Sequence, residues 1–386
     1  MPQPTPEPEQ VPIGFKADLS DAVATTRSAG DGVLDNDVLQ AKGFGVYCWY
    51  TGTADFTTPK ASRPAGATYT MLMRNQKVEY ITISNDPEEG YWTYSPSKYW
   101  PLNPSELLTF RAYAPYTDYI VTDDNGMPQL PVMVDKDDYH NGSQHDPLWG
   151  TGKHDGTLDS DDATTDNEVY GKLYNNYTYA MSGDKLASDS RDGTIDWYFH
   201  HGMAMLVFYA KLDENASGTA EIVSITIGPL NNQGLLDISS PATSSSDVPA
   251  WGDRGGNMNV TLYGHHDTET QDLNEYVINK DGLTQLMPLT PGGQPKGLLI
   301  IPRAYNNSTQ LIITVSYKAP ATGSQINTVT TTLPNDKSGF NEFLGNKIYK
   351  LNLTVGNALV ADIESVNVAT TTNWDEKEGE HEVYNW

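Results

Sequence analysis

Apolar residues recur at every second position in several short runs of this chain. In residues 349–355, Tyr349, Leu351, Leu353 and Val355 alternate with polar residues. Residues 80–83, 222–227 and 311–317 are further short runs of this kind. Successive side chains of a strand point to opposite faces of a sheet, so a period of two predicts half-buried strands. Few windows repeat apolar residues at helical spacing, and we therefore predict an all-β fold.

Clusters of turn-forming residues separate these runs. Residues 124–126 read Asp-Asn-Gly, residues 231–234 read Asn-Asn-Gln-Gly, and residues 291–293 read Pro-Gly-Gly. Many short strands punctuated in this way favour antiparallel β-sandwiches with Greek-key connections.

The length of the chain indicates more than one core. A chain of 386 residues suits two domains of moderate size. Residues 135–196 are rich in Asp, Asn, Gly, Ser and His, which predicts large loops and an interdomain connection. We place a Pro- and Glu-rich tether at residues 1–12, a first sandwich at 13–180 and a second at 181–386.

The charge of the chain restricts its partners. Lys and Arg number 24 against 50 acidic residues, a formal net charge of −26. Such a surface repels phosphates, so nucleic acids and anionic membranes are poor partners. No run approaches the roughly 18 apolar residues of a membrane helix. A tether like residues 1–12 commonly follows a lipid-anchor site, so we expect membrane attachment only through an N-terminal lipid anchor on an exported precursor, whose signal peptide this sequence lacks.

The single cysteine, Cys48, excludes an intrachain disulfide. It sits in the apolar run 45–50 with no basic neighbour, which favours a buried small hydrophobe over a reactive thiol.

A polar central segment offers candidate metal ligands. His140, His145 and His154 lie among many Asp residues, and alternate carboxylates of Asp155–Asp166 can gather around calcium. An EF-hand needs Gly and Glu where this segment has Ser160 and Asp166, so a solvated acidic loop is the favoured interpretation. No zinc spacing is present either, and we predict neither a metal nor a cofactor.

Catalytic motifs are missing from the sequence. It contains no nucleophile elbow, phosphate-binding loop or dinucleotide fingerprint, so we do not expect an enzyme. A carboxylate pair for glycoside hydrolysis depends on the fold and stays open.

Histidines and aromatics near loops have structural interpretations. Neighbouring strand residues face opposite ways, so His200 and His201 cannot share a metal; a buried, hydrogen-bonded histidine is favoured, and His201 is expected to hold a backbone partner. Tyr91-Trp92, Trp149 and Trp251 would stack on sugars if exposed, but core positions are favoured.

Several short segments of the chain, spread over about residues 14 to 374, form a characteristic series. They are Thr26-Arg27, Gly43 to Thr51, Tyr99-Trp100-Pro101, Leu107, Phe110 to Tyr116, Phe199 to Leu206, Leu299 to Pro302, Gly345 to Leu351, and Trp374. In their order and spacing, these segments together resemble the fimbrillin family of Bacteroidales type V fimbrial subunits.

The resemblance implies two transthyretin-like sandwiches and export to the outer surface as a lipoprotein. It also implies that an Arg-specific protease removes the first strand, and that a strand from a neighbouring subunit fills the groove. The matching cut in this sequence follows Arg27 and releases residues 11–19. Arg63 precedes Pro64 and is a poor site. An ordinary exposed charge is the alternative interpretation of Arg27.

The resemblance therefore predicts a structural and adhesive surface subunit, with other fimbrial subunits and a host or microbial glycan or protein as partners. Residues 375–386 carry glutamates instead of alternating apolar residues, which suits a tip or accessory role better than a stalk. A non-polymerising surface lipoprotein that binds glycans is the second hypothesis, and a carbohydrate-active enzyme is the third.

Overall fold

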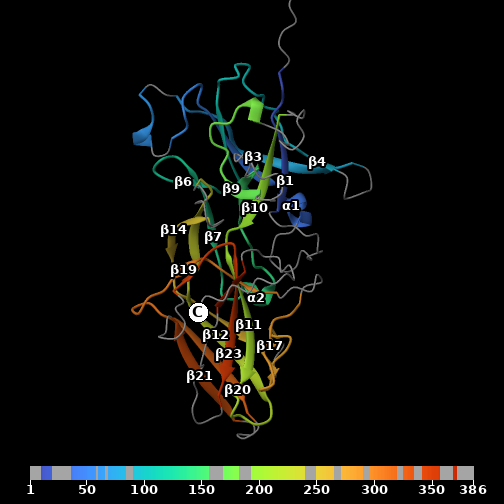
Figure 1. The fold of residues 1–386 in the computed structure, drawn as a ribbon, viewed down its shortest axis with the longest axis vertical. Coiled ribbons are helices and arrows are strands. Elements are labelled where there is room, and N and C mark those ends of the chain that lie inside the picture. The colour runs from blue at the N-terminus through green and yellow to red at the C-terminus, as the bar shows by residue number, and fades with distance from the viewer. Residues whose placement is uncertain are drawn as a thin grey trace, which may run out of the picture.

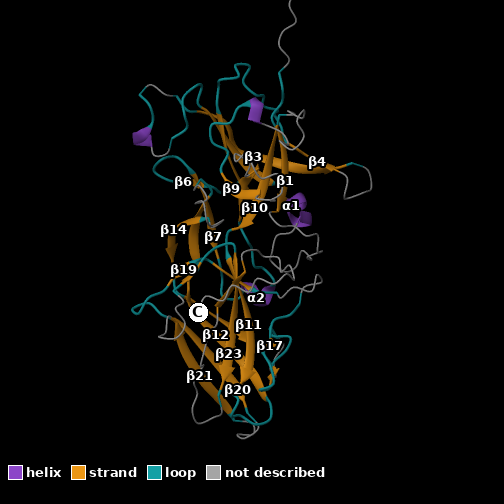
Figure 2. Cartoon of the chain, in the orientation of Figure 1, coloured by secondary structure: helices purple, strands orange, loops and turns teal. Residues whose placement is uncertain are grey.

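The computed structural model describes residues 10–19, 36–57, 60–65, 68–83, 90–155, 168–181, 193–239, 249–264, 271–289, 296–319, 325–333, 341–356 and 368–371. These residues form an elongated molecule with a group of strands at each end (Figure 1). Nearly all its regular structure is strand, with only short helices (Figure 2). The all-β prediction is confirmed.

The elements follow one another in this order along the chain. They are β1 (Gly14–Leu19), α1 (Asn36–Lys42), β2 (Phe44–Tyr50), η1 (Lys60–Ser62), β3 (Thr70–Thr82), β4 (Gly90–Thr93), β5 (Leu108–Ala114), β6 (Val121–Thr122), β7 (Pro128–Met133), α2 (Asp138–Asn141), β8 (Leu148–Asp155), β9 (Glu168–Lys172), η2 (Tyr179–Met181), β10 (Thr194–His201), β11 (Ala204–Leu212), β12 (Ala220–Leu230), β13 (Gln233–Asp237), β14 (Ala250–Gly255), β15 (Met258–Tyr263), β16 (Val277–Ile278), β17 (Thr284–Gln285), β18 (Leu298–Ile300), β19 (Arg303–Ala304), β20 (Leu311–Lys318), β21 (Ile326–Leu333), β22 (Glu342–Phe343), β23 (Lys347–Val355) and β24 (Val368–Thr371).

An eight-stranded sheet forms the first group, in the order β1-β10-β8-β5-β2-β3-β4, with β9 beside β8. Its central strands β2 and β5 are buried along almost their whole length because apolar cores lie on both faces, and β5 includes the buried polar residues Thr109 and Arg111. On one face, Val46 and Cys48 join the same apolar core as Phe110, while Tyr47 and Trp49 point to the other core. The predicted burial of Cys48 is confirmed.

Two five-stranded sheets form the second group. One has the order β17-β11-β23-β24 with β18 beside β11, and the other has the order β15-β12-β20-β21 with β16 beside β12. Alternate residues Leu311, Ile313, Val315 and Tyr317 of β20 are fully buried, as the period of two predicts. The run 349–355 likewise forms most of β23, with Tyr349, Leu351, Leu353 and Val355 buried.

A four-stranded sheet, β14-β13-β7-β6, lies between the two groups (Figure 1). In this sheet β7 pairs with β13. These two strands lie on opposite sides of the domain boundary that the sequence predicts near residue 180. The eight-stranded sheet also takes in β10, which passes directly into β11 through Gly202 and Met203. The domain boundary near Ala180 and the transthyretin-like topology stay predictions.

Two features differ from what the sequence predicts. Residues 135–196 are not only loops, because β8 and β9 lie within them. The polar composition hid β8, whose residues 148–151 are buried. The described pairs are antiparallel except β1 with β10 and β11 with β23, which are parallel. A period of two does not distinguish the two pairings.

Candidate functional site

The first strand, β1, lies at the end of the eight-stranded sheet. Among the described strands it pairs with β10 alone, in parallel, from Gly14 opposite Thr194 to Leu19 opposite Phe199. An end strand of this kind is attached through one ladder of backbone hydrogen bonds.

Alternate side chains of this segment enter the core. Ile13, Phe15 and Ala17 are buried, while Lys16 is exposed. The ring of Phe15 is 5.3 Å from that of Tyr94 and 6.4 Å from that of Phe110, measured between centroids. Edge-on and tilted aromatic contacts of this kind add to the stabilisation from burial. The amphipathic sequence of β1 thus makes it part of the core.

A short clamp holds the residues just before β1 on their other side. The amide of Ile13 donates to the carbonyl oxygen of Lys98 (2.8 Å), and the amide of Trp100 donates to the carbonyl oxygen of Val11 (2.9 Å). The hydroxyl of Tyr94 donates to the carbonyl oxygen of Ile13 (2.9 Å). Burial raises the pKa of Tyr94 to about 12, so this hydroxyl stays a donor.

The core beneath β1 is rich in aromatic side chains. Its members include the buried residues Phe44, Trp100, Phe110, Trp197 and Phe199. Without β1, this apolar surface and the free edge of β10 would both be exposed to water. The place of β1 is therefore an apolar groove beside β10, which β1 fills with alternate side chains.

The candidate processing site, Arg27, lies outside the described residues, so cleavage there stays a prediction. The next arginine, Arg63, is engaged by its neighbours. Its guanidinium lies 4.4 Å from the ring centroid of Tyr69 and hydrogen-bonds the carbonyl oxygens of Thr57 (3.5 Å) and Asn125 (3.4 Å).

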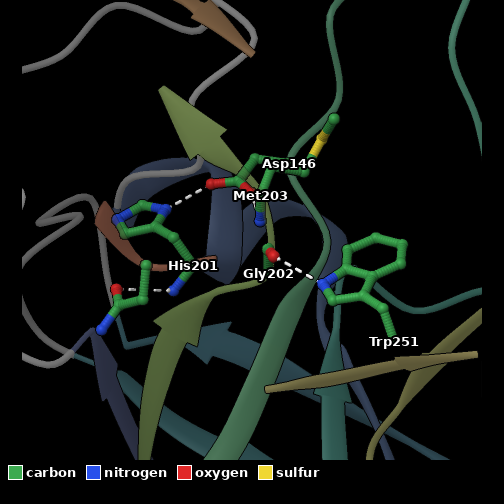
Figure 3. Close-up of polar contacts among 6 residues, drawn as sticks. Asp146, His201, Gly202, Met203 and Trp251 are labelled. Carbon is green, nitrogen blue, oxygen red and sulfur yellow. Dashed lines mark hydrogen bonds and ion pairs between the residues drawn. The ribbon is translucent and has the colours of Figure 1, made fainter. Parts of the chain in front are cut away.

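A second polar arrangement surrounds the joint between β10 and β11, which consists of Gly202 and Met203 (Figure 3). The amide of Gly202 donates to the carbonyl oxygen of Pro147 (2.7 Å), and the carbonyl oxygen of Gly202 accepts from the indole Nε1 of Trp251 (2.9 Å). The carbonyl oxygen of Met203 accepts from the amide of Asn346 (2.9 Å). Three separate segments therefore converge on two residues.

The carboxylate of Asp146 completes this arrangement (Figure 3). Its Oδ1 accepts from the amide of Met203 (3.3 Å), and its Oδ2 pairs with Nδ1 of His201. The amide of His201 donates to Oδ1 of Asn346 (3.3 Å). The expected core position of His201 is confirmed, and Nδ1 of its ring pairs with a buried carboxylate; a backbone partner for the ring stays a prediction.

His200 is also buried, and its Nε2 hydrogen-bonds Oγ1 of Thr151 (2.8 Å). The prediction of a buried, hydrogen-bonded histidine therefore holds for both neighbours. Burial, with smaller contributions from the charges of His201 and Lys347, lowers the pKa of His200 to about 3. A neutral ring follows at physiological pH.

The candidate metal ligands are not brought together. His140 pairs with Asp272 (2.7 Å), and His145 is exposed. His154 lies on β8, while residues 156–166 are outside the described part of the chain. Where the chain is described, no three His, Cys, Asp or Glu side chains are placed to hold a metal. Calcium binding by Asp155–Asp166 stays untested.

The aromatic residues near loops are mostly buried, as expected. Trp149 is fully buried, and Trp92 and Trp251 pack against the two cores. Tyr91 is the exception, because 52% of it is exposed. It faces away from the core on β4, opposite Ile81 of β3.

Sequence reasoning missed the roles of Asp146 and Asn346. Asp146 is one of several aspartates in a polar segment, and Asn346 lies in a short turn before β23; both are far along the chain from His201 and Met203. Only the folded arrangement of the β10–β11 joint identifies them.

The family described as fimbrillin-like matches residues 26–374 of this chain. A fimbrial protein from Bacteroides vulgatus has a similar structure, with a TM-score of 0.56 and 16% identity over 94% of this chain and 98% of that chain. The tip fimbrial protein Mfa3 from Porphyromonas gingivalis aligns with a TM-score of 0.35 and 11% identity over 93% of this chain and 98% of that chain. No curated protein sequence matches this chain.

In the described part of the chain, no helix is long and apolar enough to cross a membrane. The likeness to the Bacteroides vulgatus protein shows a shared fold. The family match covers most of the chain, including the strands from β2 to β24. The chain therefore belongs to the fimbrillin-like family.

Proposed function

We propose that this chain is a subunit of a cell-surface fimbrium, and that a strand from a neighbouring subunit replaces β1 during assembly. The observation that carries the proposal is the placement of β1. It is an end strand with one described partner strand, yet it fills an apolar groove with Ile13, Phe15 and Ala17. Membership of the fimbrillin-like family supports the fimbrial role.

Strand replacement needs little net free energy. A donated strand restores the backbone hydrogen bonds of β10 and covers the same apolar surface that β1 covered. The obstacle is covalent, because β1 stays connected to the rest of its own chain. Cleavage after Arg27 removes that connection, and the large aromatic core then favours the complex with a new strand.

The groove sets requirements for the donated strand. It must present apolar residues at alternate positions, with an aromatic residue in the place of Phe15. A small residue fits best at the position of Gly14, because a Cβ there would lie 3.0 Å from Oγ1 of Thr194, which would have to shift slightly. Residues 375–386 of this chain do not meet these requirements, and we propose a tip or accessory role for that reason.

Digestion with an Arg-specific protease tests the proposal. The full chain is digested, the fragments are identified by mass spectrometry, and the oligomeric state is followed by size-exclusion chromatography. We expect a first cut after Arg27, after which the cleaved chain binds an added fluorescent peptide of residues 10–19 that then co-elutes with it. The Arg27→Ala variant is expected to stay uncut at this position and not to bind the peptide.

A cut at Arg27 after which the chain does not bind the added strand peptide contradicts strand replacement. That outcome favours the second candidate, a surface lipoprotein that binds glycans without polymerising. The exposed ring of Tyr91 supports that candidate, because an exposed aromatic face stacks on sugars. Glycan-array binding that is lost in Tyr91→Ala would then support it.

A further inference from the structure

A two-residue connection between sheets is ordinarily a place where a protein bends. Such joints have exposed backbone groups that exchange partners with water during motion. The joint between β10 and β11 is different. The amide and carbonyl groups of both Gly202 and Met203 are hydrogen-bonded to other segments of the chain.

The joint also lacks room to rearrange. A Cβ atom on Gly202 would lie 2.5 Å from the carbonyl oxygen of Pro147. A Cβ atom on Gly345 would lie 2.4 Å from the carbonyl oxygen of Gly202. Glycine at both positions allows three backbone segments to pass in direct contact, which leaves no space for a bend.

Residues 134–147, between β7 and β8, extend these contacts, and we call this segment the clasp. The clasp contains α2 and reaches the second group of strands. The hydroxyl of Tyr139 donates to the carbonyl oxygen of Lys296 (3.1 Å), and Nδ1 of His140 pairs with Oδ1 of Asp272 (2.7 Å). Tyr139 is buried, so these contacts form an internal interface.

Gln144 of the clasp is buried and makes two hydrogen bonds to β18 and its preceding residue. Its Nε2 donates to the carbonyl oxygen of Gly297 (3.2 Å), and its Oε1 accepts from the amide of Leu299 (2.8 Å). The side-chain amide thus donates to one backbone carbonyl oxygen and accepts from one backbone amide, as the backbone of a paired strand would. β18 pairs with β11, the strand that follows the joint. The clasp is therefore connected to β11 through β18.

We propose that the clasp and the β10–β11 joint form a rigid coupling that fixes the angle between the sheet containing β1 and the sheet containing β11 and β23. The Asp146–His201 pair anchors the coupling, since the Asp146 carboxylate bridges the His201 ring and the Met203 amide. Separate groups of strands ordinarily move relative to one another unless their interface is extensive and well packed. In this interface Tyr139, Gln144, Asp146 and Pro147 are buried, and each contacts residues outside the clasp, while Asn141, Gly142 and His145 between them are exposed.

The coupling has a mechanical consequence if β1 is replaced by a donated strand, and this step alone rests on the proposed function. Tension applied to that strand passes to β10 through their shared ladder, and then through the joint to β11 and its parallel partner β23. A fixed joint keeps successive subunits aligned under load. The rigidity itself is independent of cleavage at Arg27.

Pulsed electron paramagnetic resonance tests the coupling on the full chain. Spin labels are placed on cysteines introduced at Tyr119, in the loop that follows β5 of the first group, and at Gly282, in the loop between β16 and β17 of the second group, in a Cys48→Ser background. Tyr119 is exposed, and a side chain at Gly282 meets no atom within 4 Å. We expect one narrow distance distribution. Asp146→Ala is expected to at least double its width.

Asp137→Ala is the matched control, because Asp137 lies in the same clasp but its side chain is exposed and pairs with Lys136, which is exposed as well. Its distribution is expected to keep the original width. A folded Asp146→Ala protein with the original width would overturn the proposal. If circular dichroism shows that Asp146→Ala does not fold, Trp251→Phe replaces it, because it removes the hydrogen bond to Gly202. Broadening then supports the coupling, and an unchanged width overturns it.

Discussion

Phe15→Ala tests whether β1 is an integral part of its core. Phe15 is only 5% exposed, and its ring contacts those of Phe44, Tyr94 and Phe110. Truncation of a buried phenylalanine removes its transfer free energy and leaves a cavity, which together cost about 3–5 kcal/mol. We expect a loss of about 3 kcal/mol, at the low end of that range, because an end strand adjusts more easily than a central one.

Equilibrium urea denaturation followed by tryptophan fluorescence measures this loss. Trp100 and Trp197 lie in the same core as Phe15, so their emission reports on its integrity. Lys16→Ala is the matched control, because Lys16 is exposed on the other face of β1 and its truncation is expected to change stability by less than about 0.5 kcal/mol. Equal small losses in both variants would refute the packing of β1 into the groove.

Three further predictions follow from buried groups. His200 is neutral in the folded protein and its pKa is about 3, whereas in the unfolded chain it titrates near about 6.5, so its contribution is present above pH 6.5 and is lost as the pH falls. Between pH 8 and pH 5, the free energy of unfolding is therefore expected to fall by about 2 kcal/mol less in His200→Gln than in the wild-type protein, as measured by urea titrations. The same fall in both proteins would contradict this. Burial raises the pKa of the Cys48 thiol well above its usual value, so we expect it to react with a thiol reagent only in denaturant; rapid labelling of the native protein would disprove its burial. Gly45→Ala is expected to lower the melting temperature, with a loss of about 1–3 kcal/mol, because its Cβ would lie 2.3 Å from the Tyr113 ring, whereas Gly282→Ala meets no atom and is the control; equal melting temperatures would argue against this contact.

The strands with regular patterns were predictable from the sequence. The alternation of Leu311 to Tyr317 and of Tyr349 to Val355 follows directly from a sheet with one buried face. The apolar run containing Cys48 similarly predicted that this cysteine is buried, and the strand that contains it is buried on both faces. In these segments, local pattern and tertiary packing agree.

The pairing of strands was not predictable in the same way. The segment containing Phe15 reads as a strand, but nothing local specifies that it lies parallel to β10, nearly two hundred residues further along the chain. β8 was hidden for a related reason, because its glycines and polar residues are accommodated by neighbours distant in sequence. Tertiary contacts decide both cases.

The candidate site was predicted only in part. The resemblance to fimbrillins indicated a separable strand in residues 11–19, and the structure places β1 there at the end of a sheet. The pairing of Asp146 with His201 had no signal in the sequence, since a polar loop of many aspartates gives no reason to choose one of them. Asp146 is distinguished from the other aspartates of this loop by its burial, and burial depends on the whole fold.

Peptide binding measures strand replacement most directly. A fluorescent peptide of residues 10–19 is titrated into the chain produced from Ser28 onward, and fluorescence anisotropy follows binding. We predict saturable binding, with at least tenfold weaker binding of the same peptide carrying Phe15→Ala, because the loss of the buried ring removes more than about 1.4 kcal/mol. Absence of binding, or equal affinity for the two peptides, would contradict the claim that the place of β1 receives a strand from another molecule.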